Sequence, residues 1–280
     1  MRILVLGAGA VGLTVAAQLS RHAEVFAVCR ERCVSAISEH NFTMTGIWGE
    51  RTLPLSVGTK APEGPWDYIT NKISAVIFTY GCNFNCWYCH NKHILKSDVK
   101  LLNQQEIFDF LNKRKGLIDA VVISGGEPTL QNDLDIFITK IKKMGYLVKL
   151  DTNGSNPNLL QDLIDKKLID YIAMDIKNDF ENYSYTCGVK VNIENIKKSI
   201  DILLSSKIDY EFRTTLAPEI LEENFENMIQ FLAKANKYYL QKCNIPKGYA
   251  IPITNHKATA EKFLEKAKKN IHYSCLRGFD

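Results

Sequence analysis

The chain has 280 residues, of which 46% are hydrophobic and 24% charged, as in an ordinary globular protein. Its net charge of +4 arises from 35 basic and 31 acidic residues, an excess too small to favour a nucleic-acid or membrane partner. No apolar run reaches the roughly 18 residues that a transmembrane helix needs. Thr14 and Gln18 interrupt the apolar start of the chain, which favours a strand and helix over a signal peptide, and we expect a cytoplasmic protein.

The composition changes near residue 70. Before this point the basic residues are almost all Arg, and after it almost all are Lys, with Arg114, Arg213 and Arg277 as the exceptions. Folding gives no reason for this shift, because either residue serves on most solvated surfaces. We therefore predict two segments of different ancestry, a short one at 1–66 and a larger domain at 67–280. Residues 61–65, which contain Pro and Gly, would form the linker.

The first segment begins with a motif typical of dinucleotide binding. An apolar strand at 2–6 leads into Gly7, Gly9 and Gly12, spaced G-x-G-x-x-G, and then into a helical pattern. Such glycines allow a tight turn and let a pyrophosphate approach the helix N-terminus. Arg30 follows a second strand at 24–28, and its guanidinium suits a ribose 2′-phosphate, which favours NADP over NAD.

This segment resembles the start of ketopantoate reductase, but only as far as about Tyr68. A complete dinucleotide domain needs a second βαβ half, and the sequence lacks it. We therefore expect a truncated Rossmann-like half domain and favour a relic over a working NADP site. An NADP-dependent dehydrogenase stays open as an alternative function.

The larger segment alternates strands with helices, which indicates a parallel sheet with helices outside it. Strands are predicted at 74–79, 120–124, 147–151, 171–175, 210–215, 238–242 and, as a seventh, 271–275. Helices are predicted at 105–113, 130–144, 158–165, 193–205, 222–234 and 258–270. This pattern predicts an α/β fold, a partial (β/α)6-type TIM-like barrel with its chemistry at the C-terminal strand ends.

Polar motifs follow five of these strands. They are GCNFNCWYCHN at 81–91, SGGEP at 124–128, DTNG at 151–154, DIK at 175–177 and RTT at 213–215. Because the carboxyl ends of parallel strands share one rim, the motifs predict an active-site mouth.

Three of the eight cysteines, Cys82, Cys86 and Cys89, are spaced C-x3-C-x2-C, which indicates a metal site in a reducing compartment. Three thiolates can hold a cubane iron–sulfur cluster and leave one iron open for chemistry. The alternative is zinc with His90 as the fourth ligand, in a non-catalytic metal-binding protein, although adjacent Cys89 and His90 chelate one ion awkwardly. The other cysteines lack the spacing of a second cluster.

Taken together, these motifs resemble the radical S-adenosylmethionine (SAM) proteins that activate anaerobic ribonucleoside-triphosphate reductase, a glycyl-radical enzyme. The likeness runs from about residue 66 to the end of the chain. It implies that Cys82, Cys86 and Cys89 ligate a [4Fe-4S] cluster whose open iron binds SAM. The remaining site residues that it implies are Tyr88 by the adenine; Gly125, Gly126 and Glu127 at the methionine amino end; Asp151, Asn153, Asp175 and Lys177 around the ribose and carboxylate; and Arg213 at the carboxylate or substrate. The resemblance also allows a monovalent cation between Asp151 and Asp175.

The resemblance further implies the reaction. An external donor such as flavodoxin or ferredoxin reduces the cluster, SAM is cleaved, and the 5′-deoxyadenosyl radical takes a hydrogen atom from a glycine of the partner protein. The expected partner is an anaerobic ribonucleotide reductase. An activase of another glycyl-radical enzyme, such as pyruvate formate-lyase, and a radical SAM enzyme with a small-molecule substrate stay open as alternatives.

Overall fold

The computed structural model describes residues 74–95, 101–244 and 256–279, and before them the short segments 2–6, 24–28, 37–38, 42–44, 51–53 and 56–58. The chain forms two compact units, Met1–Asp67 and Tyr68–Asp280. Among the described helices, none has both the length and the apolar character needed to cross a membrane.

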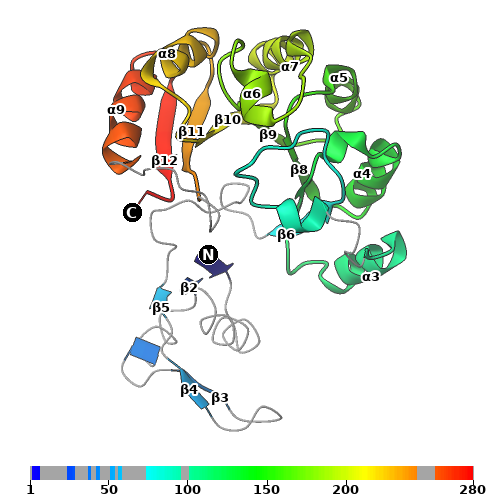
Figure 1. The fold of residues 1–280 in the computed structure, drawn as a ribbon. Coiled ribbons are helices and arrows are strands. Elements are labelled where there is room, and N and C mark those ends of the chain that lie inside the picture. Colours follow the sequence, from blue (N-terminus) through cyan, green and yellow to red (C-terminus); the bar gives the residue numbers. More distant parts are fainter. Residues whose placement is uncertain are drawn as a thin grey trace. The chain divides into compact units, whose positions relative to one another are not determined.

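The first unit contains a small parallel sheet (Figure 1). Its strands β1 (Arg2–Leu6), β2 (Glu24–Val28) and β5 (Ser56–Gly58) lie in the order β1-β2-β5, as expected for half of a dinucleotide fold. Strands β3 (Phe42–Met44) and β4 (Arg51–Leu53) form an antiparallel pair. Gly7, Gly9, Gly12 and Arg30 lie outside the described residues, so the NADP site stays a prediction.

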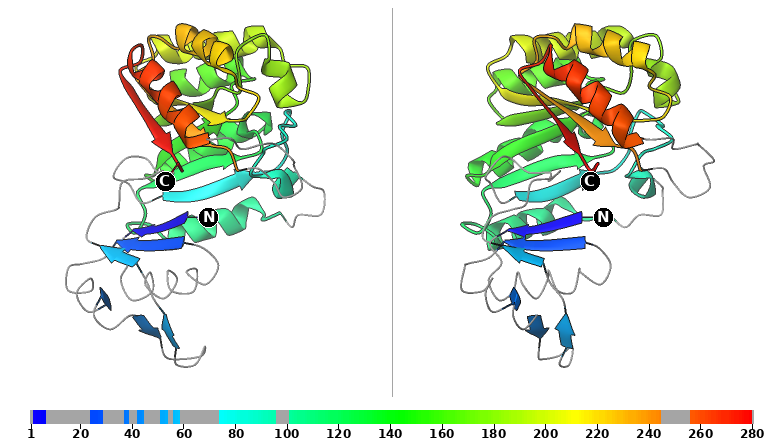
Figure 2. Two further views of the ribbon diagram at one scale, coloured as in Figure 1. Left: turned by 60° about the vertical axis from the view of Figure 1, so that its left-hand side comes forward. Right: turned by 90° about the vertical axis from the view of Figure 1, so that its left-hand side faces the viewer.

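In its described part, the second unit has a seven-stranded sheet in which every neighbouring pair is parallel. The strands follow one another in chain order: β6 (Ser74–Thr79), β7 (Ala120–Gly125), β8 (Leu147–Thr152), β9 (Tyr171–Asp175), β10 (Asp209–Leu216), β11 (Lys237–Lys242) and β12 (Tyr273–Arg277). Strands β6 and β12 are its two edges, so the curved sheet is an open, partial barrel (Figure 2). The predicted α/β class is confirmed.

Helices cover the outer face of this sheet (Figure 1). They are α3 (Gln104–Lys113), α4 (Leu134–Lys143), α5 (Pro157–Asp165), α7 (Ile193–Ser205), α8 (Glu222–Phe231) and α9 (His256–Lys268). Their amphipathic spacing buries apolar side chains against one face of the strands. On the strands, these fully buried positions include Val121, Ile123, Val148, Leu150, Ile172, Met174, Phe212 and Leu240.

Most predicted bounds agree with the structure to within two residues, but α8 ends three residues earlier than predicted, at Phe231, and two other differences have identifiable causes. Strand β12 begins two residues later than predicted, because the Ile271 N–H still bonds the Ala267 carbonyl at 2.9 Å and so closes α9. Helix α4 begins late because Pro128–Leu130 forms a separate 3-10 turn, η2. The short helices α6 (Tyr183–Cys187) and η1 (Lys92–Leu95) were not predicted, since so few residues show no periodicity.

The inner face of the sheet differs from the outer face in chemistry. Adjacent strands place Lys149 beside Tyr171, and Asp175 beside Arg213, on this face. Lys149, Asp151 and Arg213 are buried despite their charge. Part of the interior of this half barrel is therefore ionic, beside apolar residues such as Val122 and Ala173, whereas most barrels are filled by branched apolar side chains.

Candidate active site

The three clustered cysteines lie on the loop that follows β6. Cys86 is buried, and Cys82 and Cys89 are half-buried. The Phe84 N–H donates to the Cys82 sulfur at 3.4 Å, and the Cys89 N–H to the Cys86 carbonyl at 3.2 Å, which fixes the loop around its own cysteines. No three His, Cys, Asp or Glu side chains among the described residues gather closely enough for one metal ion. Three thiolates on one short loop are soft ligands, which suit an iron–sulfur cluster and also zinc.

A fourth cysteine touches this loop. Cys187, at the end of α6, is fully buried, and its carbonyl accepts from the Asn85 N–H at 2.8 Å. A hydrogen bond from the Cys187 thiol, helped by the nearby Lys177 ammonium, lowers the pKa of Cys86 to about 6 in spite of burial. The spacing of Cys187 gave no sign of this contact, which depends on the fold of α6.

The two glycines of the second motif press against the end of β6. Gly125 has φ +119°, and a Cβ there would lie 2.3 Å from the Thr79 nitrogen. A Cβ on Gly126 would lie 1.8 Å from the Gly81 carbonyl oxygen. The Gly126 N–H donates to the Thr79 carbonyl at 3.0 Å, so only glycine allows this close approach.

The Glu127 carboxylate joins the ends of β7 and β8. It is completely buried and accepts four hydrogen bonds: from the Thr129 N–H at 3.1 Å and hydroxyl at 2.6 Å, the Thr152 hydroxyl at 2.8 Å, and the Asn153 N–H at 2.6 Å. Burial raises the pKa of Glu127 in spite of these donors. The sequence predicts Glu127 at the methionine amino end, and its buried side chain is in addition a positioning group for the ends of these strands.

Asn153 carries this connection on to the cysteine loop. Its amide nitrogen donates to the Asn83 side-chain oxygen at 2.9 Å and lies 4.0 Å from the Cys82 sulfur. Asn83 in turn donates to the Ser155 hydroxyl at 2.9 Å. The glycine, aspartate–asparagine and cysteine motifs thus form one hydrogen-bonded rim.

The predicted charged residues form a second group at the same mouth. The Arg213 guanidinium bridges two strands, with Nε 2.9 Å from Asp175 Oδ1 and a terminal nitrogen 3.5 Å from Asp151 Oδ2. Lys177 Nζ lies 3.0 Å from Asp175 Oδ2. Burial opposes the charge on Asp175, but Arg213 and Lys177 outweigh it and lower the pKa of Asp175 to about 2. Burial likewise opposes the charge on Lys177, yet Asp175 and its other neighbours raise the pKa of Lys177 well above its ordinary value.

A deeper layer of charges supports this group and was not predicted. Lys149, buried on β8, lies 3.4 Å from Asp151 Oδ1. Glu211 on β10 accepts two hydrogen bonds from Arg277, at 2.8 and 3.0 Å, and one from the Tyr171 hydroxyl at 2.9 Å. A signal was available, because Lys149 precedes Asp151, and Glu211 precedes Arg213, by the two residues that keep a side chain on the same strand face.

Two buried polar atoms at this mouth make no hydrogen bond among the described residues: the Tyr88 hydroxyl, and Asp151 Oδ1, which is in ion-pair contact with Lys149 at 3.4 Å. Burial raises the pKa of Tyr88 well above its ordinary value, so the ring stays neutral. Unpaired buried polar groups are rare in proteins and often mark a place where a ligand binds. Both residues were predicted to contact a nucleoside ligand.

Comparison with known proteins agrees with this arrangement. The Radical SAM superfamily model matches residues 76–232, and the Ketopantoate reductase PanE/ApbA model matches residues 3–79. The second match therefore runs past the first unit into β6, which hydrogen-bonds with β7.

Two Methanocaldococcus jannaschii proteins named putative glycyl-radical enzyme activating enzymes are similar to this chain. One is 41% identical over 223 residues, covering 74% of this chain and 91% of that protein, and the other is 32% identical over 171 residues, covering 59% and 64%. Among solved structures, Streptococcus suis SuiB bound to S-adenosylmethionine has a TM-score of 0.60 at 16% identity, covering 74% of this chain and 50% of that one, which shows a shared fold.

The superfamily match spans more than half of the chain and includes the cysteine loop, the glycine motif and both charged strand ends. It favours an iron–sulfur cluster over the zinc alternative. The chain thus belongs to the radical SAM superfamily, and it is an oxidoreductase that uses a [4Fe-4S] cluster and S-adenosylmethionine.

Proposed function

We propose that this enzyme generates a glycyl radical on a partner protein, and that the partner is an anaerobic ribonucleoside-triphosphate reductase. The observation that carries the proposal is the 41% identity to a putative glycyl-radical enzyme activating enzyme across 91% of that protein. Similarity of this extent reaches beyond the cysteine loop into the strands and helices that form the mouth. The choice of the reductase as partner depends on the motifs of the sequence.

In this proposal, Cys82, Cys86 and Cys89 hold the cluster. The low pKa of Cys86, which the Cys187 hydrogen bond causes, favours the thiolate that a metal ligand must supply. With both groups bound, one electron from the reduced cluster would break the S–C5′ bond and release methionine, and the 5′-deoxyadenosyl radical would take a hydrogen atom from glycine to give 5′-deoxyadenosine. The electron donor would be a small redox protein such as flavodoxin or ferredoxin, in the cytoplasm.

The chain's own residues would bind and orient S-adenosylmethionine. Its ammonium group donates hydrogen bonds and needs acceptors, so the carbonyl oxygens of this motif would serve, while the Gly126 and Glu127 N–H groups stay bonded to β6 and the loop after it. Asp151 Oδ1, which makes no hydrogen bond among the described residues beyond its ion-pair contact with Lys149, would accept from a ribose hydroxyl. Lys177 and Arg213 would face the methionine carboxylate, and Tyr88 the adenine.

The charged network would keep these groups fixed. Arg213 holds the carboxylates of Asp151 and Asp175 through nearly buried contacts, so neither has to reorganise when the ligand binds. Preorganised charges of this kind lower the activation free energy, because they need not reorient during the reaction. A monovalent cation between the two carboxylates stays a prediction, and Arg213 already neutralises part of their charge.

Anaerobic reconstitution tests the proposal. The protein is loaded with iron and sulfide, reduced with dithionite, mixed with S-adenosylmethionine and the reductase, and assayed for 5′-deoxyadenosine and for a glycyl radical by electron paramagnetic resonance. We expect about four irons per chain and both products. Cys86→Ala should abolish both products, whereas Cys243→Ala, which removes a buried cysteine outside the loop, should retain them.

A small-molecule substrate is the second candidate. The 7-carboxy-7-deazaguanine synthase of Clostridium acetobutylicum is 27% identical over 186 residues, covering 82% of that protein. In this case 5′-deoxyadenosine would form without any protein radical, and its yield would depend on an added small molecule. An NADP-dependent reaction is tested by titrating the protein with NADPH.

A further inference from the structure

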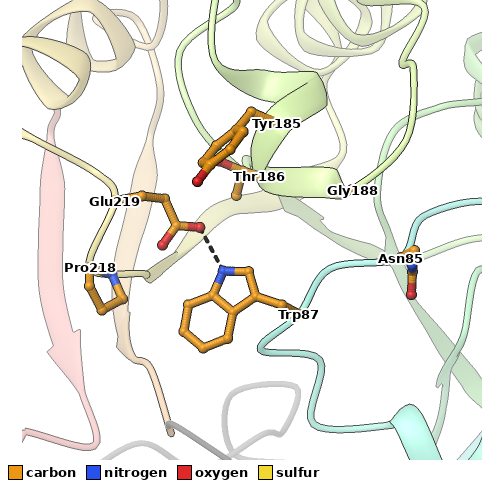
Figure 3. A pocket seen from close by; sticks show the side chains of 7 residues that line it. All are labelled: Asn85, Trp87, Tyr185, Thr186, Gly188, Pro218 and Glu219. Atoms are coloured by element: carbon orange, nitrogen blue, oxygen red, sulfur yellow. Dashed lines mark hydrogen bonds between the residues drawn. The ribbon is translucent and has the colours of Figure 1, made fainter. Parts of the chain in front are cut away.

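A pocket of about 620 Å³ opens beside the cysteine loop (Figure 3). Three segments line it: the loop after β6, helix α6 with the residue after it, and the connection from β10 to α8. The lining residues are Asn85, Trp87, Tyr185, Thr186, Gly188, Pro218 and Glu219. In Figure 3 the side chains of Trp87, Glu219 and Tyr185 gather on one side of it.

The pocket is adjacent to the proposed cluster. Trp87 lies between Cys86 and Cys89 in the sequence, and its ring meets the Tyr88 ring edge-on at 5.5 Å. The far wall is equally close to this loop, since a Cβ on Gly188, with φ +64°, would lie 2.8 Å from the Asn85 carbonyl oxygen. A group that enters the pocket therefore touches the cysteine loop itself.

The chemistry of the walls favours a cation. Of the described residues that line the pocket, Glu219 alone is charged, and its Oε1 accepts from the Trp87 indole N–H at 2.9 Å. None of the described Lys or Arg side chains forms a salt bridge with Glu219. Tyr185 is 76% exposed, a large aromatic surface left open to solvent. Aromatic faces next to a carboxylate attract Lys ammonium and Arg guanidinium groups.

We propose that this pocket binds a Lys or Arg side chain on the glycine-bearing loop of the partner protein, between the Trp87 and Tyr185 rings and against Glu219. The proposal depends on the proposed function, because a protein substrate is what would bring such a loop to the mouth. Docking beside the cysteine loop would place the loop's glycine near the site of radical formation.

Direct binding tests this idea without radical chemistry. The Kd between the reconstituted protein and the reductase is measured by anaerobic calorimetry, for the wild type and for Glu219→Gln. Glutamine keeps an oxygen for the Trp87 indole but removes the charge, so we expect the Kd to rise about tenfold and its salt dependence to weaken. Tyr185→Ala should also weaken binding, and because the Tyr185 side chain is exposed, its removal leaves the buried core intact.

Glu223→Gln is the matched control, because Glu223 is exposed on α8 outside the pocket. It should leave the Kd unchanged, and iron content is measured for every variant. An unaltered Kd in both pocket variants, or no binding of the reductase by the wild type, would overturn the docking proposal. If the pocket variants weaken binding but the wild type forms no glycyl radical, docking is supported and the proposed function fails.

Discussion

Replacing Glu127 by glutamine should weaken the whole rim of the site. Each carboxylate oxygen of Glu127 accepts from a backbone N–H, Oε1 from Thr129 and Oε2 from Asn153. A glutamine has one carbonyl oxygen and one amide nitrogen, so it can satisfy only one of the two N–H donors. If the oxygen keeps the position of Oε1, the new amide points its hydrogens at the Asn153 N–H.

The loss of stability in Glu127→Gln follows from the burial of this side chain. Glu127 is completely buried, so water cannot compensate the donor that is left without an acceptor. Losing a hydrogen bond to a charged group and leaving one backbone donor unmet together cost about 2 to 4 kcal/mol of unfolding free energy. The damage should be concentrated at Asn153, whose side chain bonds Asn83 in the cysteine loop.

Two measurements check this expectation. Urea unfolding of the metal-free protein gives the loss of stability, and hydrogen exchange reports faster exchange of the Asn153 amide. Glu106→Gln is the control, because Glu106 lies in an exposed capping box where glutamine serves equally well, and we expect a loss below about 0.5 kcal/mol. Equal unfolding midpoints for Glu127→Gln and the wild type, with unchanged Asn153 exchange, would refute the reasoning.

Three further predictions concern the same mouth. Gly126→Ala should prevent cluster reconstitution, measured as iron content, because its Cβ would lie 1.8 Å from the Gly81 carbonyl oxygen. Arg213→Lys should raise the Kd for S-adenosylmethionine about tenfold, because one ammonium cannot hold two carboxylates as a guanidinium does; an unchanged Kd in equilibrium dialysis would exclude this role. Burial opposes the charge on Glu211, but Arg277 lowers the pKa of Glu211 to about 2, below the ordinary 4.5. The contribution of Glu211 to the free energy of unfolding is therefore complete above about pH 4.5 and is lost as the pH falls towards 2. In Glu211→Gln the free energy of unfolding should therefore depend less on pH between 4.5 and 2 than in the wild type. An unaltered pH dependence in this range would contradict the assignment.

The sequence predicted the fold of the second unit well because its signals are local. Apolar runs bounded by turn residues defined β6 and β9 to the residue, and amphipathic spacing defined α7 equally well. Predictions failed where a contact from elsewhere decides the bound. Helix α4 is one example. The η2 turn before it is capped by the Glu127 side chain, and Glu127 also binds Thr152 at the end of β8 and Asn153 just after it.

The site was predicted only as far as its motifs reach. Spacing alone indicated the cysteines, and strand ends indicated Asp151, Asp175 and Arg213, because each belongs to a continuous motif. The contact of Cys187 with Cys86 joins residues far apart in sequence, and no spacing rule covers it. The Trp87–Glu219 hydrogen bond is similar, since it depends on how the connection after β10 folds over the cysteine loop.

The charged residues on the inner face of the sheet have a functional explanation. Burying ion pairs such as Glu211 with Arg277 stabilises a fold little compared with apolar packing, because desolvation offsets most of the attraction. An interior built for stability alone would be apolar, as the outer face of the same strands is. The inner charges instead continue towards the mouth, from Lys149 to Asp151 and Arg213, so that the deep layer holds the rim carboxylates in place. We infer that these strands trade stability for a fixed polar surface, which a ligand with an ammonium, a carboxylate and two ribose hydroxyls requires.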